Sequence, residues 1–480
     1  MGPLGFLRHA ANNSAGKGIS QMKKPLKLTF LADTHYYSKS LGVSGRQYEL
    51  RSGSDQKCLA ETEEIITAAF EEIGNSDTDA VMIAGDLTND GERVCHEEFR
   101  ELARGLAQKK PLYLITATHD WCCDGNPRRY DGDMVFHDVP TLSSESLHDF
   151  YRDFGPKQAI SVFQTHLGTA SYVIALSGSV WLLALIDDQN GKGRAGFFED
   201  HFLWIEEQLR RAQEQGVLVI GMEHHLLLPH VSSLFTGGAC VGDREAVASR
   251  LADAGLRYMV VGHSHIQHTK RFVSKKGNAL TEINVGSLCG YPGPICEITI
   301  QPDQTLSYEV RRLASFRLGG KEIDAQRFFK QHATAMIRRV LESPDRLELT
   351  DRLTALQLPG AKIGRFYGAI RPVLQFIRTA DLGRCYRLLK RLGLARGIQK
   401  EWVLAYEHMP LTEVIDGMMC SFLDGAYEQH SRNSAYYQLV MGAVSIPSRL
   451  FPKNGDLQKL IDAADEILAG DEINAQRAEI

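Results

Sequence analysis

The sequence lacks the long apolar run that crosses a membrane. No stretch approaches the ~18 consecutive apolar residues of a span, and the first 24 residues carry four basic side chains but no apolar core of signal-peptide length. We therefore expect a soluble, cytoplasmic protein without a membrane span. Residues 1–24 are predicted to be a disordered or tag-like arm; its first 21 residues fit equally a disordered segment, an added tag or an upstream start before Met22.

Paired cysteines and an excess of one charge are also absent. The nine cysteines are odd in number and scattered, with only Cys122 and Cys123 adjacent, which is no disulfide framework and favours a reducing compartment. Lys and Arg total 54 against 59 for Asp and Glu, a net charge of −5. This balance gives no general attraction to nucleic acid or acidic membranes, so we expect no nucleic-acid partner.

The composition is that of an ordinary globular protein, with 43% hydrophobic and 24% charged residues. A chain of 480 residues exceeds the size at which one core keeps growing, so two domains are expected. The chain shows no internal repeat, heptad run or low-complexity tract.

Short apolar runs alternate with helical patterns in the first 318 residues. Leu59, Ile65 and Phe70 recur at helical spacing between two of these runs, which indicates an α/β sheet with helices packed outside. The runs that predict strands are Leu26–Leu31, Ala80–Ala84, Leu112–Ile115, Trp181–Ile186, Val217–Ile220, Tyr258–Val261, Leu280–Val285 and Ile295–Ile300.

Long amphipathic segments dominate after Gly319-Gly320, and we place a domain boundary near residue 318. The segments Asp324–Leu341, Arg365–Leu389 and Leu411–Ser431 predict an all-α domain over 319–480 that serves as a lid, a dimerisation surface or an accessory element. It is also the candidate surface for a homo-oligomer. The basic stretch Arg384–Arg391 fits a cationic face for an anionic substrate or an ordinary solvated face.

Asp and His residues gather directly after five of the predicted strands. Because the carboxyl ends of neighbouring strands meet at one edge of a sheet, these side chains should emerge together. Carboxylate oxygen and imidazole nitrogen are ligands for divalent and trivalent cations. The groups are Asp33-Thr-His35, Gly85-Asp86, His119-Asp120, His224-His225 and Gly262-His263-Ser-His265.

Each group alone also has an ordinary interpretation. Asp33 fits a solvated loop, Asp86 a turn or helix cap, and His119 a surface turn. His263 and His265 are the strongest pair, since two desolvated imidazoles beyond a buried strand need partners. The joint occurrence of all five groups after matching strands predicts a cluster that holds two metal ions.

This order of residues resembles the calcineurin-like metallophosphoesterase superfamily, as in bacterial-type members with a C-terminal helical domain. The resemblance covers about residues 26 to 312 and implies a catalytic domain over 25–318. It implies an α/β class fold, a four-layer α/β/β/α sandwich with a dinuclear site at one edge. It further implies a metal-bridging hydroxide that attacks phosphorus in line.

The family pattern also assigns roles by position. Asp33, His35, Asp86 and His265 would hold the first metal, Asp86 would bridge, and His224 and His263 would serve the second metal. His224 is chosen over His225 because the ligand in similar proteins is the first His of such a pair. His119 would be the catalytic imidazole near the leaving group, oriented by Asp120 or another acid. Asn89 and His225 are the candidate substrate-binding residues.

Two departures from the family pattern stand out. Thr118 precedes His119 where the family has an Asn that ligates the second metal, and its hydroxyl is a weaker neutral ligand. Asn89 stands three residues after Asp86, where a Tyr would give the chromophore of purple acid phosphatases. The Asp-Arg-Gly sequence typical of Ser/Thr protein phosphatases is missing.

The function that follows is metal-dependent hydrolysis of phosphomonoester or phosphodiester bonds in a small phosphorylated substrate. The donor set suits Mn, Fe or Zn. Nucleotides, cyclic nucleotides, phospholipid headgroups and phosphosugars all remain candidate substrates. Two alternatives stay open: a metallophosphoesterase-like scaffold with weakened catalysis that binds a partner, and a nuclease of the same fold.

Overall fold

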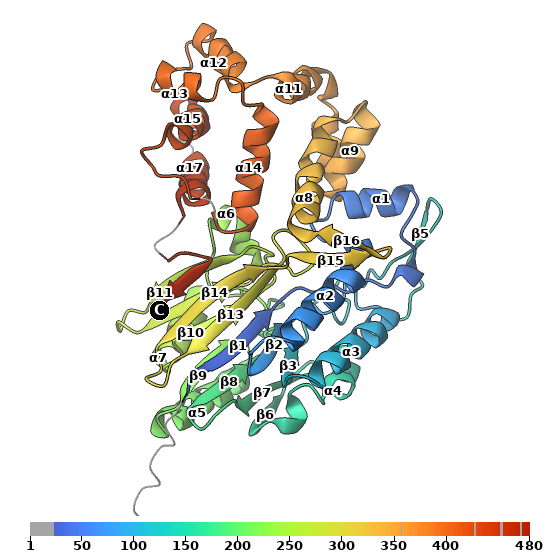
Figure 1. The fold of residues 1–480 in the computed structure, drawn as a ribbon, viewed down its shortest axis with the longest axis vertical. Helices are drawn as coiled ribbons and strands as arrows, with labels where there is room; N and C mark the ends of the chain where they lie inside the picture. Colours follow the sequence, from blue (N-terminus) through green and yellow to red (C-terminus); the bar gives the residue numbers. More distant parts are fainter. Residues whose placement is uncertain (1–23, 357, 427–428, 452–454, 471–472) are drawn as a thin grey trace, which may run out of the picture.

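The structure, a computed structural model, describes residues 24–480 except 357, 427–428, 452–454 and 471–472 (Figure 1). The predicted N-terminal arm lies outside the described residues apart from Lys24.

Two sheets form the centre of the molecule. The first has the strand order β17-β14-β13-β1-β2-β3, in which β1, β2 and β3 are parallel and β13, β14 and β17 are antiparallel to their neighbours. Its strands are β1 (Leu26–Leu31), β2 (Ala80–Ala84), β3 (Leu112–Ile115), β13 (Pro294–Ile300), β14 (Leu306–Arg312) and β17 (Arg477–Glu479).

The second sheet has the order β11-β12-β10-β9-β8-β7-β6, with β8, β9, β10 and β12 parallel. Its strands are β6 (Ser161–Gln164), β7 (Ala170–Ala175), β8 (Val180–Ala184), β9 (Leu218–Met222), β10 (Tyr258–Val261), β11 (His268–Val273) and β12 (Ala279–Asn284). Two hairpins stand apart, β4 (Arg129–Asp131) with β5 (Met134–Phe136) and β15 (Ser315–Leu318) with β16 (Lys321–Asp324).

The two sheets pack face to face over a buried core. Alternate residues of each strand point to opposite faces, so Leu28 and Phe30 of β1 meet Leu182 and Val260 of the second sheet, while Leu31 faces outward. Both faces of the central strands are apolar because both are covered.

Helices cover the two outer faces. On the first sheet, α2 (Thr62–Gly74), α3 (Arg93–Ala107) and α4 (Ser144–Tyr151) bury residues such as Ile65 and Phe99; on the second, α5 (Glu199–Glu214) and α7 (Arg244–Asp253) bury Ile205 and Leu251. The predicted four-layer α/β/β/α sandwich is thereby confirmed. Shorter pieces are α1 (Arg46–Gly53), α6 (Ser233–Thr236) and 3-10 turns at Lys39–Leu41, Leu59–Glu61, Pro156–Gln158 and Gly237–Ala239.

The C-terminal helices form an arch over one end of the sandwich (Figure 1). The helix α14 is central to it, since it contacts α8, α11 and α17. The helices are α8 (Ala325–Leu341), α9 (Arg346–Ala355), α10 (Gly360–Gly364), α11 (Tyr367–Thr379), α12 (Leu382–Arg391), α13 (Lys400–Ala405), α14 (Leu411–Leu423), α15 (Ala435–Val444), α16 (Ile446–Leu450) and α17 (Gly455–Ala469).

The arch differs from the predicted all-α domain in three places. The segment Arg365–Leu389 is broken into α11 and α12, because Asp381 leaves the helix and its side chain accepts from Arg384 N to cap a new one. The helix that begins at Leu411 ends at Leu423 rather than at Ser431. Gly425, just beyond its end, has φ +67 and lies so close to Gln267 O that a Cβ would clash with it. The range 319–480 is not all helical: β16 lies within it, and β17 returns to pair with β14.

Among the described residues, none of the helices combines the length and apolar character that a membrane crossing demands. All nine cysteines are free.

Phe329 of α8 connects the arch to the sandwich. Its ring is fully buried and stacks on Phe316 at a centroid distance of 6.3 Å. We expect Phe329→Ala to lower the free energy of unfolding by about 3–5 kcal/mol, since it leaves a cavity. The matched control is Phe366→Ala, at a ring that is 66% exposed, which should change stability by less than about 0.5 kcal/mol. Urea denaturation of both variants measures the difference; equal losses would contradict the packing role of Phe329.

Candidate metal centre

The predicted ligands all lie in loops directly after strands. Asp33 and His35 follow β1, Asp86 follows β2 and His119 follows β3, all in the first sheet. The other contributors come from the second sheet, where His224 follows β9 and His263 and His265 follow β10. The carboxyl ends of the parallel strands of both sheets therefore meet at one edge of the sandwich, as expected from the sequence.

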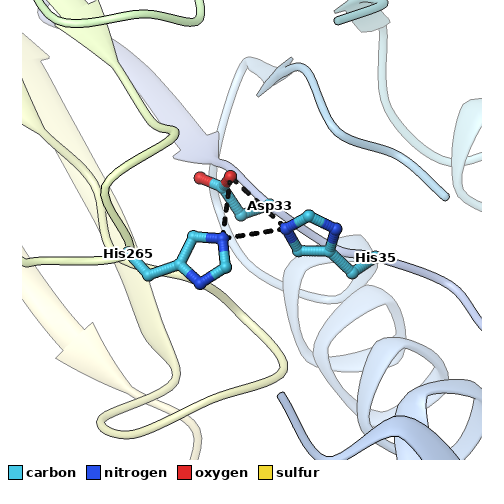
Figure 2. A group of neighbouring side chains, drawn as sticks. All are labelled: Asp33, His35 and His265. Atoms are coloured by element: carbon cyan, nitrogen blue, oxygen red, sulfur yellow. Dashed lines mark hydrogen bonds and ion pairs between the residues drawn. The ribbon is translucent and has the colours of Figure 1, made fainter. Parts of the chain in front are cut away.

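Asp33, His35 and His265 converge on one point (Figure 2). The Nε2 atoms of His35 and His265 are 2.9 Å apart, and Asp33 Oδ1 lies 3.6 Å from the first and 3.4 Å from the second. Asp33 Oδ1 is buried and makes no hydrogen bond. Ligand atoms about 2.0–2.2 Å from a shared ion lie about 3 Å from one another, so this spacing fits a cation.

Asp86 connects this cluster to a second one. Its Oδ2 lies 3.9 Å from His35 Nε2 on one side and 3.0 Å from His224 Nε2 on the other. His263 Nδ1 completes the second cluster at 3.2 Å from His224 Nε2. The Nδ1 atom of His224 faces the Ala84 carbonyl at 2.8 Å, a contact that orients the ring. One carboxylate thus stands between two groups of potential ligands.

The backbone at these residues is strained. Ten described non-glycine residues have positive φ, and five of them are Asp33, His35, Asp86, His263 and His265, with φ between 43° and 66°. Such conformations are uncommon for residues with a Cβ and cluster at functional sites. Loop-to-loop hydrogen bonds hold them, including Asp33 N to Gly85 O at 3.2 Å and His35 N to Asp86 O at 2.9 Å.

Two glycines permit the close approach of these loops. A Cβ on Gly85 would lie 2.8 Å from His224 Nδ1, and a Cβ on Gly262 would lie 2.4 Å from Asp33 Oδ2. Gly85 also has φ +86. Both positions therefore accept no larger residue without displacement of a neighbouring ligand.

The ionisation of the donors suits metal binding. Burial works to raise the pKa of Asp33 and Asp86, but the nearby histidine charges outweigh it and hold each pKa below its ordinary value. Burial and the charge of Lys57 lower the pKa of His35 to about 3, and burial together with His225 holds the pKa of His263 well below its ordinary value. Ionised carboxylates and neutral imidazoles are the forms that coordinate cations.

His224 shows that a positive charge is favoured between the carboxylates. Burial works to lower its pKa, but Asp86 outweighs burial and raises the pKa well above the ordinary value. A cation placed beside His224 Nε2 would satisfy the same negative charge. The residues present therefore fit a pair of metal ions.

His119 lies at the rim, with its side chain 35% exposed. Its Nδ1 bonds the Asn89 carbonyl and lies 3.7 Å from Asp90 Oδ1. Burial works to lower the pKa of His119, but the charges of Asp86 and Asp90 outweigh burial and raise that pKa. His119 also belongs to a cluster with His35 and Asp86.

Of the two predicted options for the acid that orients His119, Asp120 or another acid, Asp120 does not contact the imidazole. Its carboxylate accepts from Ala117 N at 2.9 Å, Thr88 N at 2.9 Å and Thr88 Oγ1 at 3.1 Å, and so fixes the turn beneath His119 rather than the imidazole. The acid beside the ring is Asp90. The reason is local: the side chain of Asp120 points back into the loop after β2.

The two predicted substrate-binding residues are both buried. Asn89 presents its carbonyl, not its amide, to His119, and its Nδ2 donates to Asp90 Oδ2 at 2.9 Å. His225 is 6% exposed and is held by Asp187, which accepts from His225 N at 2.7 Å and lies 3.0 Å from Nδ1. A further group of potential metal ligands lies beside the two clusters and consists of Asp187, Asp188 and His225.

Thr118 precedes His119 as expected, and its hydroxyl interacts with the Cys123 thiol. Its role as a metal ligand stays a prediction.

Two residues near the site were missed by sequence reasoning. Asp90 follows Asp86 by four residues, and its position in the loop after β2 was the only available signal. Lys57 is 4% exposed, lies 3.5 Å from Asp55, and acts electrostatically on His35 and His119. It comes from an irregular loop with no pattern, so nothing in the sequence indicated its place.

Comparison with known proteins decides the family. The family model for calcineurin-like phosphoesterases matches residues 26–267, about half of the chain. The chain belongs to this family. The predicted resemblance is therefore confirmed, while a search of curated proteins finds no match.

Several solved structures are similar to this metallophosphoesterase. A dimetal phosphatase from Danio rerio shares 11% identity over 63% of this chain and 98% of its own, with a TM-score of 0.43. A purple acid phosphatase from yellow lupin, Lupinus luteus, shares 13% over 63% of this chain and 53% of its own (TM-score 0.40). A 5'-nucleotidase precursor from Thermus thermophilus shares 14% over 66% and 59% (TM-score 0.35).

The position of Asp86 between the two groups of potential ligands gives a test of this arrangement. We expect Asp86→Asn to lower the metal content of the purified metallophosphoesterase by at least one ion per chain, since a neutral amide cannot offset two cations. Elemental analysis measures the content, with Asp303→Asn at an exposed turn as the control. Unchanged stoichiometry in Asp86→Asn would show that Asp86 does not bridge.

The close approach at Gly262 gives a second test, in which none of the proposed ligand residues is substituted. Gly262→Ala should weaken metal binding by about 10-fold or more, because its Cβ would displace Asp33. Gly105→Ala is the matched control: Gly105 lies in α3 with nothing within 4 Å of an added Cβ. Titration of the metal-depleted protein with Mn²⁺ compares the two. Equal affinities would contradict the steric argument.

Proposed function

We propose that this metallophosphoesterase hydrolyses phosphate esters, either monoesters or diesters, with two metal ions held on either side of Asp86. The observation that carries the proposal is the geometry around that carboxylate, which faces His35 at 3.9 Å and His224 at 3.0 Å and so serves both ligand groups. Asp33, His35 and His265 would hold one ion, and His224 and His263 the other.

When bound, such a pair of cations lowers the pKa of a coordinated water and neutralises the charge of the attacked phosphate. The chain supplies the remaining parts. His119 is placed to protonate the departing oxygen, because its Nδ1 bonds the Asn89 carbonyl and the other proton of the imidazolium therefore lies on Nε2. The charges of Asp86 and Asp90 raise the pKa of His119, which is the direction that favours this protonated form.

Asp90 is the positioning residue for His119. Its carboxylate is 4% exposed and lies between the imidazole and two guanidinium groups, Arg51 at 3.7 Å and Arg128 at 3.4 Å. These cations keep Asp90 ionised: burial works to raise its pKa, but His119 and Arg51 outweigh burial and lower it. The negative charge stabilises the imidazolium that proton donation requires.

The role of His119 can be separated from metal binding. We expect His119→Ala to reduce kcat by roughly 10²- to 10⁴-fold, the usual contribution of a general acid, with metal content unchanged. The control is His166→Ala, at a side chain that is 49% exposed and paired with Asp200. Turnover of chromogenic phosphate monoesters and diesters in added Mn²⁺, together with elemental analysis, measures both effects.

Two outcomes would contradict these assignments. Loss of metal in His119→Ala would make His119 a ligand rather than an acid. A wild-type protein with less than one metal per chain and no activity on either ester class would instead favour the binding scaffold with weakened catalysis.

A further inference from the structure

A cleft of about 1220 Å³ opens beside the metal centre, and its walls come from the second-sheet side of the sandwich. His225 and His263 lie at the end near the metal ligands. The other walls are the loop after β8, the segment that leads into α7, and the turn between β11 and β12. The volume exceeds what one phosphate group occupies, so the cleft has room for the rest of a substrate.

Basic side chains line this cleft. Arg194, Arg244, Lys275 and Lys276 are among its lining residues. Lys276 is paired with Asp253 at 3.3 Å, but no ion pair of the described residues involves Arg194, Arg244 or Lys275. Of the lining acids, Asp243 is paired with Lys192 at 2.6 Å.

The unpaired charges in the cleft are therefore mainly positive. With Asp253 and Asp243 both engaged, Glu245 is the one lining acid without an ion pair among the described residues. Two of the free cations are arginines, whose planar guanidinium groups match phosphate oxygens in a two-point geometry. An anion in the cleft would meet these groups without breaking an existing ion pair.

The two arginines are tied by the backbone to His225. Leu226 and Cys240 form an isolated β-bridge. Leu226 N donates to Ala239 O at 3.1 Å, and Val241 N donates to Leu226 O at 2.8 Å. These bonds fix the loop that precedes Arg244. Gly242 N then donates to Ala195 O at 2.9 Å, next to Arg194. The positions of both arginines are thus set relative to the residue that follows His224.

We propose that the natural substrate is a phosphoester that carries a second phosphate group, and that Arg194 and Arg244 bind this second group while the metal centre holds the scissile one. This inference rests on the proposed hydrolase function and narrows its substrate class. Lys275 adds positive charge at the turn between β11 and β12 and draws polyanions into the cleft.

The test compares substrates that differ by one phosphate. The holoenzyme is assayed for phosphate release from fructose 6-phosphate and fructose 1,6-bisphosphate, and from adenosine 5'-monophosphate and adenosine 3',5'-bisphosphate. p-Nitrophenyl phosphate and bis(p-nitrophenyl) phosphate report the basal activity. We expect at least one bisphosphate to exceed its monophosphate partner by roughly 10-fold or more in kcat/KM.

The double variant Arg194→Gln with Arg244→Gln should remove that preference. We expect kcat/KM for the bisphosphate to fall roughly 10- to 100-fold, with the basal rate within roughly 2-fold of wild type. For Arg244→Lys, kcat/KM for the bisphosphate should lie between the values of the wild type and the double variant, since lysine keeps the charge but lacks the planar guanidinium. The matched control is Arg152→Gln, at an exposed arginine directly after α4, which should behave as wild type.

A competition measurement covers substrates that bind without turnover. The bisphosphates should inhibit hydrolysis of p-nitrophenyl phosphate more strongly than the monophosphates, and the double variant should lose the difference. Equal rates and equal inhibition within each pair, or a preference that survives in the folded double variant, would overturn the inference. Absence of basal activity on both chromogenic esters would instead overturn the proposed function.

Discussion

The structure depends on the convergence of strand ends from two sheets onto a backbone held in an unfavourable conformation. Asp33, His35, Asp86, His263 and His265 all have positive φ, a conformation that costs a residue with a Cβ about 1–3 kcal/mol. The surrounding loops impose it, since His263 N donates to Asp33 Oδ2 and Ser287 Oγ donates to Asp33 O. The packing of the sandwich therefore offsets the backbone strain that directs carboxylates and imidazoles to one point.

The division of the site between sheets explains why both sheets need apolar faces. Ligands from the loops after β1 and β2 meet ligands from the loops after β9 and β10, so any slip of one sheet over the other would separate them. The core between the sheets, which includes Phe30, Met82, Ile220 and Val260, opposes such a slip because its close-packed side chains interlock.

The sequence predicted the strand ends better than the loops. Apolar runs followed by Asp or His were enough to expect the ligands in one place, and the amphipathic spacing of Asp324–Leu341 predicted α8. The role of Asp90, the nearby charge of Lys57 and the turn of the Asp120 side chain into the loop after β2 depend on loop conformation. Four or five residues of sequence contain no periodic signal for such a conformation. The pairing of β17 with β14 joins residues about 170 positions apart, and three residues are too few for alternation to show a strand.

Because β17 pairs with β14, the chain that forms the helical arch both leaves the first sheet and returns to it. The chain departs after Arg312 and comes back at Arg477, which pairs with Glu309, while Tyr258 OH donates to the Ile480 carbonyl. Each flank of the arch is thus independently anchored in the sandwich. A single peptide-bond cut between α11 and α12 would therefore leave each half of the arch attached to the sandwich by its own end.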